Sequence, residues 1–511
     1  MKHYLYGLTI HSIQGYIFQT NKLKEIAGAS ELVEQICTTE FAKMINIDFD
    51  LFKKDSHAIR FTAGNIRYVF EDETLCRKVV KGFPKRILEF APGIHISQAV
   101  VEISETDEFQ KKSEELERKL TVQRNNPNRP VDLSYMAINR SRRTGLPSVE
   151  RKRSNNEDLI NDRATKLKRD IIDRFNKENT ISRLNLDFFG EEDSKRNIPV
   201  DFEEIVSSNP NNTGYSWLAV IHADGNNMGK ALQDLGNANA QTLKAFSEAV
   251  DLSTKTAAQK AFFKVMQNEE LNEKETIPFR PIIVGGDDLT IVCRADLALK
   301  FTEAYLMEFN EQTITNFKNA NLSKLENGIT ACAGIAFVKS SYPFHYAIGL
   351  AEKLCAHAKK DAKSKVNANE LVPSCLMFHK VQDSFVEDFA EIIDRELTAK
   401  KSDVRFDFGP YYIIKKDKNI TYEPTIDGLL AATKFLHGKE GNAIKSGLRQ
   451  WLTDMHDNKG MAEQRMNRLL SVGKPNILAN LNLEIKKKGI FEGKTPVYDW
   501  LTVLSINPND D

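Results

Sequence analysis

The sequence predicts an α+β protein with two ferredoxin-like units, a connector between them and a helical C-terminal region. Segments of strand and helix character follow one another twice in the order β-α-β-β-α-β. Linkers rich in Asn, Pro and Ser lie at residues 125–130 and 207–213. Beyond residue 383 the pattern is mostly helical.

The two units are expected to share one element order. In the first unit, strands are predicted at residues 4–10, 57–70 (a Gly-centred pair) and 94–103, and helices at 21–44, 74–90 and 107–124. In the second unit, strands are predicted at residues 216–223, 281–291 (a pair around a turn), 328–338 and 375–381, and helices at 230–235, 240–267, 296–318 and 344–362. Residues 63–66 (A-G-N-I) take the place of G-G-D-D at 285–288, so we expect no metal at the first turn.

These elements predict four domains, at residues 1–126, 127–212, 213–382 and 383–511. The second is a polar, partly helical connector. Its basic stretch at residues 140–153 is either solvated or a phosphate-contacting loop. In the fourth domain, helices are predicted at residues 425–437, 441–456 and 461–472 and a short strand at 411–415, with no catalytic signal of their own.

The composition is that of an ordinary globular protein, with 41% hydrophobic and 28% charged residues among 511. The formal net charge is zero, so nucleic acid would have to bind through local patches or partner subunits. We expect neither a signal peptide nor a membrane span, because no apolar run approaches about 20 residues. The six cysteines form no C-x-x-C pair, which favours core positions in a reducing cytoplasm over disulfides or zinc.

The strongest functional signal is the segment P-I-I-V-G-G-D-D-L-T-I at residues 281–291. β-forming residues on both sides predict two strands joined by a tight turn. Gly285 and Gly286 allow a ligand to approach the backbone closely. Asp287 and Asp288 would then lie side by side, and a divalent cation would relieve their repulsion. A solvated hairpin turn is the alternative, because Gly and Asp are common turn residues.

A third carboxylate is expected to join this pair. Asp224 ends a buried strand and lies 63 residues before Asp287. In a β-α-α-β-β unit the first strand lies beside the hairpin, so the three carboxylates should meet at one rim of the sheet. Such a set can hold two Mg²⁺ or Mn²⁺ ions about 3.5–4 Å apart. One ion would activate a ribose 3′-hydroxyl and the other would bind the triphosphate, as in nucleotidyl transfer.

The turn after Asp224 is expected to contact a nucleotide. Its backbone N–H groups and the following helix N-terminus suit a phosphate. Lys230 adds a positive charge, unless it is an ordinary solvated lysine. His222 favours a structural role in the strand over a role as a base. The polar turn residues concerned are Gly225, Asn226, Asn227 and Gly229.

Four segments occur in a fixed order in the second unit: I-H-A-D-G-N-N-M-G-K, I-I-V-G-G-D-D-L-T-I-V, G-I-T-A-C-A-G-I-A-F with S-Y-P-F after it, and A-E-K-L-C-A-H-A-K-K. Together they resemble the catalytic palm of the large, polymerase/cyclase subunit of type III CRISPR effectors, the Cas ten family. The opening L-T-I-H-S-I-Q-G-Y-I-F-Q-T-N-K-L-K-E-I-A-G-A-S-E-L is similar to that family's first, degenerate palm. The resemblance covers about residues 4–103 and 216–383. The G-G-D-D piece alone also fits diguanylate cyclases, whose helix carries a lysine at the position of Lys359.

The resemblance implies two palm domains of the GGDEF/polymerase-like fold and Mg²⁺-dependent conversion of ATP into cyclic oligoadenylates in antiviral defence. It implies metal binding by the three aspartates, and Lys359 facing the nucleotide's phosphates beside Gly285 and Gly286. A surface lysine near a helix C-terminus is the alternative for Lys359. Residues 28–30 of the first palm would help to bind a second nucleotide. The implied partners are ATP, CRISPR RNA, small Cas subunits and, as an activator, target RNA.

Three departures from the family pattern modify these expectations. The chain starts directly in the first palm, so we expect no HD nuclease and no cleavage of single-stranded DNA. Residues 142–149 contain no cysteine where many relatives bind zinc, so we expect no structural zinc. Asn226 replaces the usual second acidic residue, which leaves fewer carboxylates for metal. Two other functions stay open: a non-catalytic, nucleotide-binding scaffold of a type III CRISPR ribonucleoprotein, and a stand-alone defence cyclase without guide RNA.

Overall fold

The structure is a computed structural model that describes most of the chain. The described residues are 2–62, 64–104, 107–126, 137–154, 157–178, 180–208, 216–236, 239–267, 269, 275–367, 370–382, 389–413, 423–472 and 489–507. The residues at which three expected domains begin, 127, 213 and 383, lie outside this set, as do Ala63 and the end of the strand expected at 411–415.

The N-terminal unit contains a four-stranded antiparallel sheet in the order β2-β3-β1-β4. This order is the ferredoxin-like arrangement that the sequence predicts. Its strands are β1 (Lys2–His11), β2 (Ala58–Thr62), β3 (Asn65–Phe70) and β4 (His95–Ser104).

Helices cover this sheet on both faces, and buried aromatic rings fill one side of it. Phe41 packs against Tyr6, Phe52 and Phe83 at ring-centroid distances of 5.4–5.9 Å. The predicted helix at 21–44 is a continuous helical path that includes a π-helical turn (Ile36–Glu40). The α-helices of this unit are α1 (Ile13–Ile17), α2 (Leu23–Gln35), α3 (Phe41–Met44), α4 (Phe49–Lys54), α5 (Glu73–Phe90) and α6 (Phe109–Asn125).

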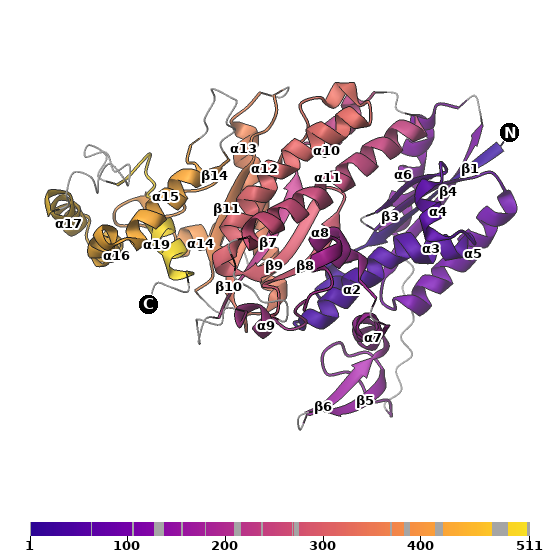
Figure 1. Cartoon of the computed structure of the whole chain (residues 1–511), viewed down its shortest axis with the longest axis horizontal. Helices are drawn as coiled ribbons and strands as arrows, with labels where there is room; N and C mark the ends of the chain where they lie inside the picture. Colours follow the sequence, from indigo (N-terminus) through magenta and orange to yellow (C-terminus); the bar gives the residue numbers. More distant parts are fainter. Residues whose placement is uncertain are drawn as a thin grey trace.

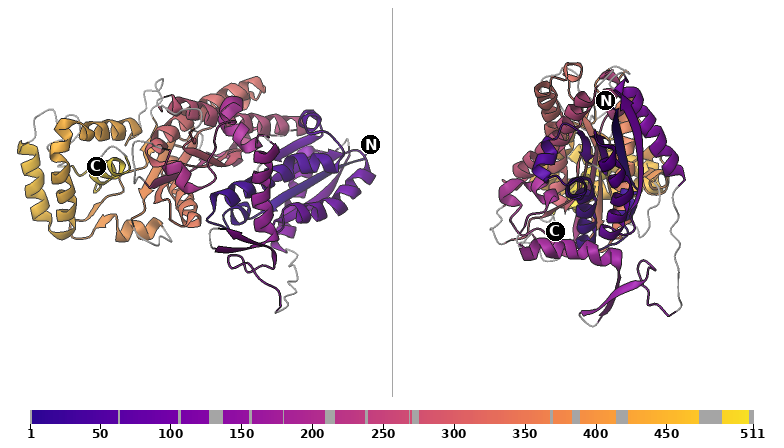
Figure 2. Two further views of the ribbon diagram at one scale, coloured as in Figure 1. Left: turned by 60° about the horizontal axis from the view of Figure 1, so that its bottom comes forward. Right: turned by 90° about the vertical axis from the view of Figure 1, so that its right-hand side faces the viewer.

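The connector is more ordered than its polar composition suggests. Its hairpin of β5 (Ser148–Ser154) and β6 (Glu157–Asp162) projects from the body of the molecule (Figure 2). Helix α7 (Arg163–Glu178) packs on α2, and the helices α8 (Arg183–Asp193) and α9 (Phe202–Val206) contribute buried phenylalanines to the main core. The connector therefore joins the two units by packing as well as by covalent linkage.

The second unit contains a six-stranded sheet in the order β14-β11-β10-β7-β9-β8. The four strands β10-β7-β9-β8 repeat the ferredoxin-like order, and β11 adds to β10 in parallel through a helical crossover. The strands are β7 (Trp217–Gly225), β8 (Phe279–Gly285), β9 (Asp288–Arg294), β10 (Ala331–Lys339), β11 (Cys375–Lys380) and β14 (Tyr411–Tyr412).

Long helices bury this sheet. Helices α11 (Ala240–Met266) and α12 (Ala295–Asn319) run side by side along it (Figure 1). Helix α13 (Phe344–Ser364) lies close to β10, where Gly334 faces the backbone of Ala351. The short helix α10 (Met228–Asp234) follows β7, and a 3₁₀ turn (Ser323–Leu325) precedes β10.

The C-terminal region lies at the end of the molecule opposite the N-terminus (Figure 1). It is mainly helical, as predicted, but its strand β14 also extends the second sheet at β11. Its other elements are α14 (Phe389–Arg395), β12 (Thr398–Ala399), β13 (Val404–Arg405), α15 (Ile426–His437), α16 (Lys439–Asp457), α17 (Lys459–Val472) and α19 (Val497–Ser505).

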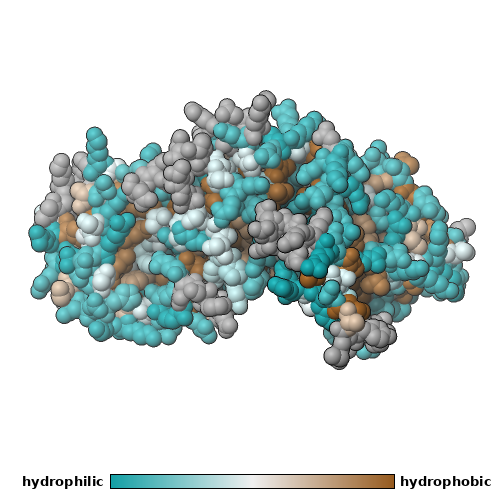
Figure 3. Space-filling model, turned by 90° about the horizontal axis from the view of Figure 1, so that it is seen from below, coloured by the Kyte–Doolittle hydropathy of each residue, from teal (hydrophilic) through white to brown (hydrophobic). Residues whose placement is uncertain are grey.

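Hydrophilic residues cover most of the face seen in Figure 3. Among the described helices, none combines the length and the apolar character that crossing a bilayer requires. All six cysteines are free and buried, in agreement with the core positions predicted for them.

Candidate functional site

The turn between β8 and β9 is a two-residue hairpin loop. Gly285 pairs with Asp288, which leaves Gly286 and Asp287 in the loop. Gly286 has a φ of +61°, a left-handed conformation that glycine adopts without strain. The neighbouring strand is tied to this loop, because Gly225 N–H donates to the carbonyl of Asp287 at 3.2 Å. The loop therefore sits at the rim of the sheet, beside the end of β7.

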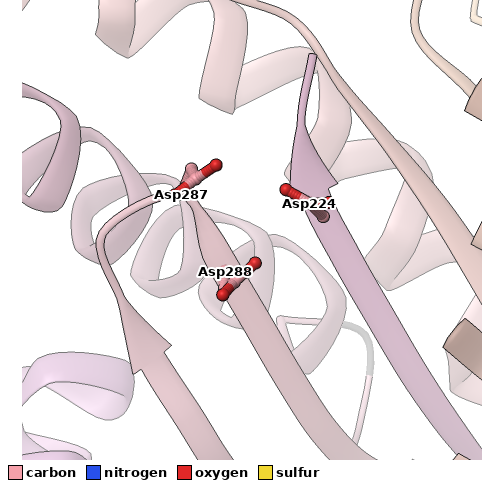
Figure 4. A group of neighbouring side chains, drawn as sticks. All are labelled: Asp224, Asp287 and Asp288. Carbon is pink, nitrogen blue, oxygen red and sulfur yellow. The ribbon is translucent and has the colours of Figure 1, made fainter. Parts of the chain in front are cut away.

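The structure brings Asp224, Asp287 and Asp288 together at this rim (Figure 4). Asp224 and Asp288 are direct cross-strand partners on β7 and β9. One carboxylate oxygen from each of the three residues lies within 4.8 Å of the others, and all three residues are half-buried. Like charges opposite each other on neighbouring strands destabilise a sheet. Oxygen ligands in this arrangement are those that Mg²⁺ and Mn²⁺ prefer.

The carboxylates perturb one another's protonation. Burial, followed by the charges of Asp287 and Asp224, raises the pKa of Asp288 to about 7. Burial and the charge of Asp224 also raise the pKa of Asp287. The free cluster is therefore an unfavourable concentration of negative charge near neutral pH, which a bound cation would relieve.

Lys359 reaches this cluster from helix α13. Its ammonium group forms an ion pair with Asp224 and donates a hydrogen bond to the carbonyl of Gly225 at 2.9 Å. Close packing of α13 on β10 makes this contact possible, because Gly334 has no side chain to separate them. Lys359 is therefore part of the site rather than a lysine of the open surface.

The residues after Asp224 take different positions around the site. The Gly225 backbone lies against Asp287, since a Cβ on Gly225 would be 2.9 Å from the Cβ of Asp287. Asn226 is buried, and its Nδ2 donates to Thr330 Oγ1 at 3.0 Å. Its Oδ1 has no hydrogen-bond partner among the described residues. Its side chain therefore points toward the start of β10.

A cavity of about 170 Å³ lies beside this turn. Asn226, Asn227 and Lys230 form part of its wall. Asn227 has a φ of +55° and precedes the first turn of α10. Gly229 lies in that helix, and no atom lies within 4 Å of the position a Cβ would take there. Three of the predicted phosphate-contacting residues, Asn226, Asn227 and Lys230, thus line this cavity, whereas Gly225 lies against Asp287 and Gly229 lies on α10.

Residues 28–30 of the first palm are covered by neighbouring elements. A Cβ on Gly28 would lie 1.6 Å from the backbone oxygen of Lys168, so α7 covers this glycine. Ser30 is buried, and its hydroxyl donates to the carbonyl of Ile282 in β8. Packing between helices and against the second sheet therefore covers these residues, and the second nucleotide site implied near them stays a prediction.

His222 has the structural role favoured from the sequence. It lies on β7 with its Nδ1 3.0 Å from Thr290 Oγ1 on β9. Burial lowers its pKa to about 4, so the ring is neutral near neutral pH.

Sequence reasoning missed two residues of helix α11 that contact the turn. Asp251 accepts a hydrogen bond from the N–H of Gly286, and Thr254 donates to the carbonyl of Gly286. The signal available was their spacing of three residues on an otherwise small and apolar face of a long helix. Which turn that face would meet was decided by the tertiary packing.

The charge cluster predicts a gain in stability when one carboxylate is neutralised. In metal-free buffer at pH 8, Asp288→Asn should raise the free energy of unfolding by about 1–2 kcal/mol. The pKa of Asp288 rises from its ordinary value of 3.8 to about 7 on folding, so wild-type stability falls as the pH rises through this window. At pH 4, close to the ordinary pKa of 3.8, the advantage of the variant should largely disappear. Urea unfolding at both pH values measures this, and equal stabilities at pH 8 would contradict it.

Comparison with known protein families gives one match. The family model described as Cas10/Cmr2, second palm domain, matches residues 217–368. This range includes the three aspartates, the hairpin and Lys359. No curated protein matches the chain.

Several solved structures share the fold at low sequence identity. The Csm1–Csm4 cassette in complex with pppApApA has a TM-score of 0.53 at 11% identity, over 99% of this chain and 69% of that one. The same cassette with AMPPNP has a TM-score of 0.52 at 12% identity, and the match again covers 99% of this chain and 69% of that one. Csm1 in T.onnurineus has a TM-score of 0.52 at 12% identity, with the same two coverages. These likenesses extend the similarity of fold to nearly the whole chain.

Proposed function

Because residues 217–368 match the family model for the second palm domain of Cas10/Cmr2, we propose that this chain is a metal-dependent nucleotidyltransferase that converts ATP into cyclic oligoadenylates. The observation that carries the proposal is the convergence of Asp224, Asp287 and Asp288 within 4.8 Å at the rim of the palm sheet. The proposed setting is antiviral defence of the type III CRISPR kind, in the cytoplasm.

The three carboxylates fit one or two divalent cations. The fit rests on their oxygen donors and their mutual distances. Burial and mutual repulsion raise the pKa of Asp287 and Asp288, and a nearby cation would favour their ionised forms. When bound, Mg²⁺ or Mn²⁺ supplies Lewis-acid activation of a ribose 3′-hydroxyl and neutralises the triphosphate. The described residues contain no other group of three or more potential metal ligands.

The chain's own residues would bind and orient the nucleotide. Gly285 and Gly286 have no side chain, so the nucleotide could approach the backbone of the turn closely. Lys359 is near enough to exchange its ion pair with Asp224 for one with a phosphate. Lys230 and Asn227 line the adjoining cavity, where Lys230 would add a positive charge. Catalysis would then come mainly from positioning and charge neutralisation.

The proposed partners follow from the structurally similar proteins. The Csm1–Csm4 cassette has been solved with AMPPNP, with one ATP and with pppApApA. We propose that this chain likewise binds ATP and acts beside small Cas subunits and CRISPR RNA. Target RNA is the proposed activator.

Mass spectrometry of the products formed from ATP tests the function. The full chain is incubated with ATP and Mg²⁺ or Mn²⁺, alone and with small Cas subunits, CRISPR RNA and target RNA. Oligoadenylates from the wild type and none from the Asp287→Ala/Asp288→Ala variant are expected. Product from the isolated chain would favour a stand-alone cyclase. ATP binding without product under any condition would overturn the proposal in favour of a nucleotide-binding scaffold.

A further inference from the structure

Two side chains of helix α11 hold the backbone of Gly286, the first residue of the hairpin loop. Asp251 Oδ1 accepts a hydrogen bond from Gly286 N–H at 2.9 Å. Thr254 Oγ1 donates a hydrogen bond to the carbonyl of the same glycine. Residues three apart share one face of a helix, so a single face of α11 satisfies both polar groups of Gly286. We call Asp251 and Thr254 the turn clamp.

Lys255 forms an ion pair with the second carboxylate oxygen of Asp251, the one that does not contact Gly286. Its Nζ lies 2.7 Å from Asp251 Oδ2 and 3.0 Å from Asp187 Oδ2 on helix α8. Only 22% of the lysine side chain is exposed. Burial disfavours its charge, but Asp251, Asp187 and Glu34 outweigh burial and raise its pKa. Lys255 is therefore a fixed cation whose carboxylate neighbours lie on α11, α8 and α2.

The turn clamp acts on the part of the chain that carries two of the three carboxylates. Gly286 immediately precedes Asp287 and Asp288, so a rotation at its backbone moves both side chains. Glycine has more backbone freedom than any other residue, and the mutual repulsion of the carboxylates favours their separation. Hydrogen bonds to both sides of Gly286 oppose these tendencies.

We propose that Asp251 and Thr254 are positioning residues for the three-carboxylate site. They set the conformation of Gly286 and thereby the separation of Asp287 and Asp288 from Asp224. Lys255 orients Asp251 and links the turn to α8 through Asp187. The inference rests on the proposed metal-dependent function. It assigns Asp251 and Thr254 an indirect role in that function, through the backbone of Gly286.

The affinity of the full chain for Mn²⁺ alone, measured by calorimetry, tests this role without requiring turnover. Asp251→Ala should weaken Mn²⁺ binding by about tenfold or more, as loss of a group that supports metal ligands usually does. Asp251→Asn keeps an oxygen acceptor for Gly286 N–H and should stay within about threefold of the wild type. Glu248→Ala is the matched control. Glu248 pairs with Lys244 four residues away on the same helix, and its partner does not contact the turn.

Kinetics with ATP provide the second measurement. Asp251→Ala should lower kcat by about 10–100-fold and change the KM for ATP by less than about threefold. Wild-type Mn²⁺ affinity in Asp251→Ala, or equal losses in the Ala and Asn variants, would overturn the positioning role. If Asp251→Ala does not fold, Thr254→Val replaces it, and wild-type Mn²⁺ affinity there overturns the role. If no variant or wild type turns over ATP, the proposed function fails, while the Mn²⁺ affinities still decide the positioning role.

Discussion

Asp224→Asn is expected to lower the rate of product formation from ATP by about 1,000-fold, equivalent to about 4 kcal/mol of transition-state stabilisation. Asp224 is the only one of the three carboxylates that comes from β7, and it is also the partner of Lys359. The substitution removes the charge of a proposed metal ligand at constant size, so the fold should be preserved.

Initial rates and Mn²⁺ calorimetry on the same preparation check this result. Glu311→Gln is a suitable control, because Glu311 is exposed on α12. Its rate should equal that of the wild type. If Asp224→Asn keeps a rate within tenfold of the wild type, Asp224 is not a ligand of the catalytic metal. The proposed three-carboxylate metal site would then be contradicted.

Gly334→Ala is expected to lower the free energy of unfolding by about 3 kcal/mol or more. A Cβ at this position would lie 2.0 Å from the carbonyl oxygen of Ala351 and 2.5 Å from the backbone nitrogen of Cys355. Both atoms belong to the backbone of α13, so the whole helix would have to move away from β10. Since α13 carries Lys359, the ion pair with Asp224 should be lost at the same time.

Gly349→Ala is the matched substitution for this test. Gly349 lies in α13 itself, and no atom lies within 4 Å of the position its Cβ would take. Alanine should stabilise the helix there by about 0.5–1 kcal/mol. Urea unfolding of the two variants should therefore shift in opposite directions. A stability of Gly334→Ala equal to that of the wild type would contradict the close packing of α13 on β10.

The local patterns of the sequence were sufficient to predict most of the helices and strands of the two units. The amphipathic period predicted helices at 74–90 and 344–362, and the structure has α5 and α13 there. The G-G-D-D turn followed from β-forming residues on either side of two glycines, and the two-residue loop confirms it. Such signals are local, because strands, turns and caps depend mainly on neighbouring residues.

Interactions between distant segments were harder to predict. Residues 28–30 have small side chains that could leave room for a ligand, yet α7 and β8 pack against this part of α2. Asp251, Thr254 and Lys255 look like ordinary polar residues of a long helix, yet they contact the turn and each other. A small or polar side chain has the same sequence signature whether it faces a ligand, a neighbouring helix or water.

The sequence by itself determined the order of strands and helices in both units and the residues that carry negative charge at the ends of β7 and at the hairpin. The ferredoxin-like order also predicted that β7 lies beside the hairpin, and the tertiary structure added the register that places Asp224 opposite Asp288. It also decided that Lys359 reaches Asp224 and that α11 holds Gly286. The physical reason is that element type depends on short-range periodicity, whereas the proximity of charges depends on which apolar faces pack together.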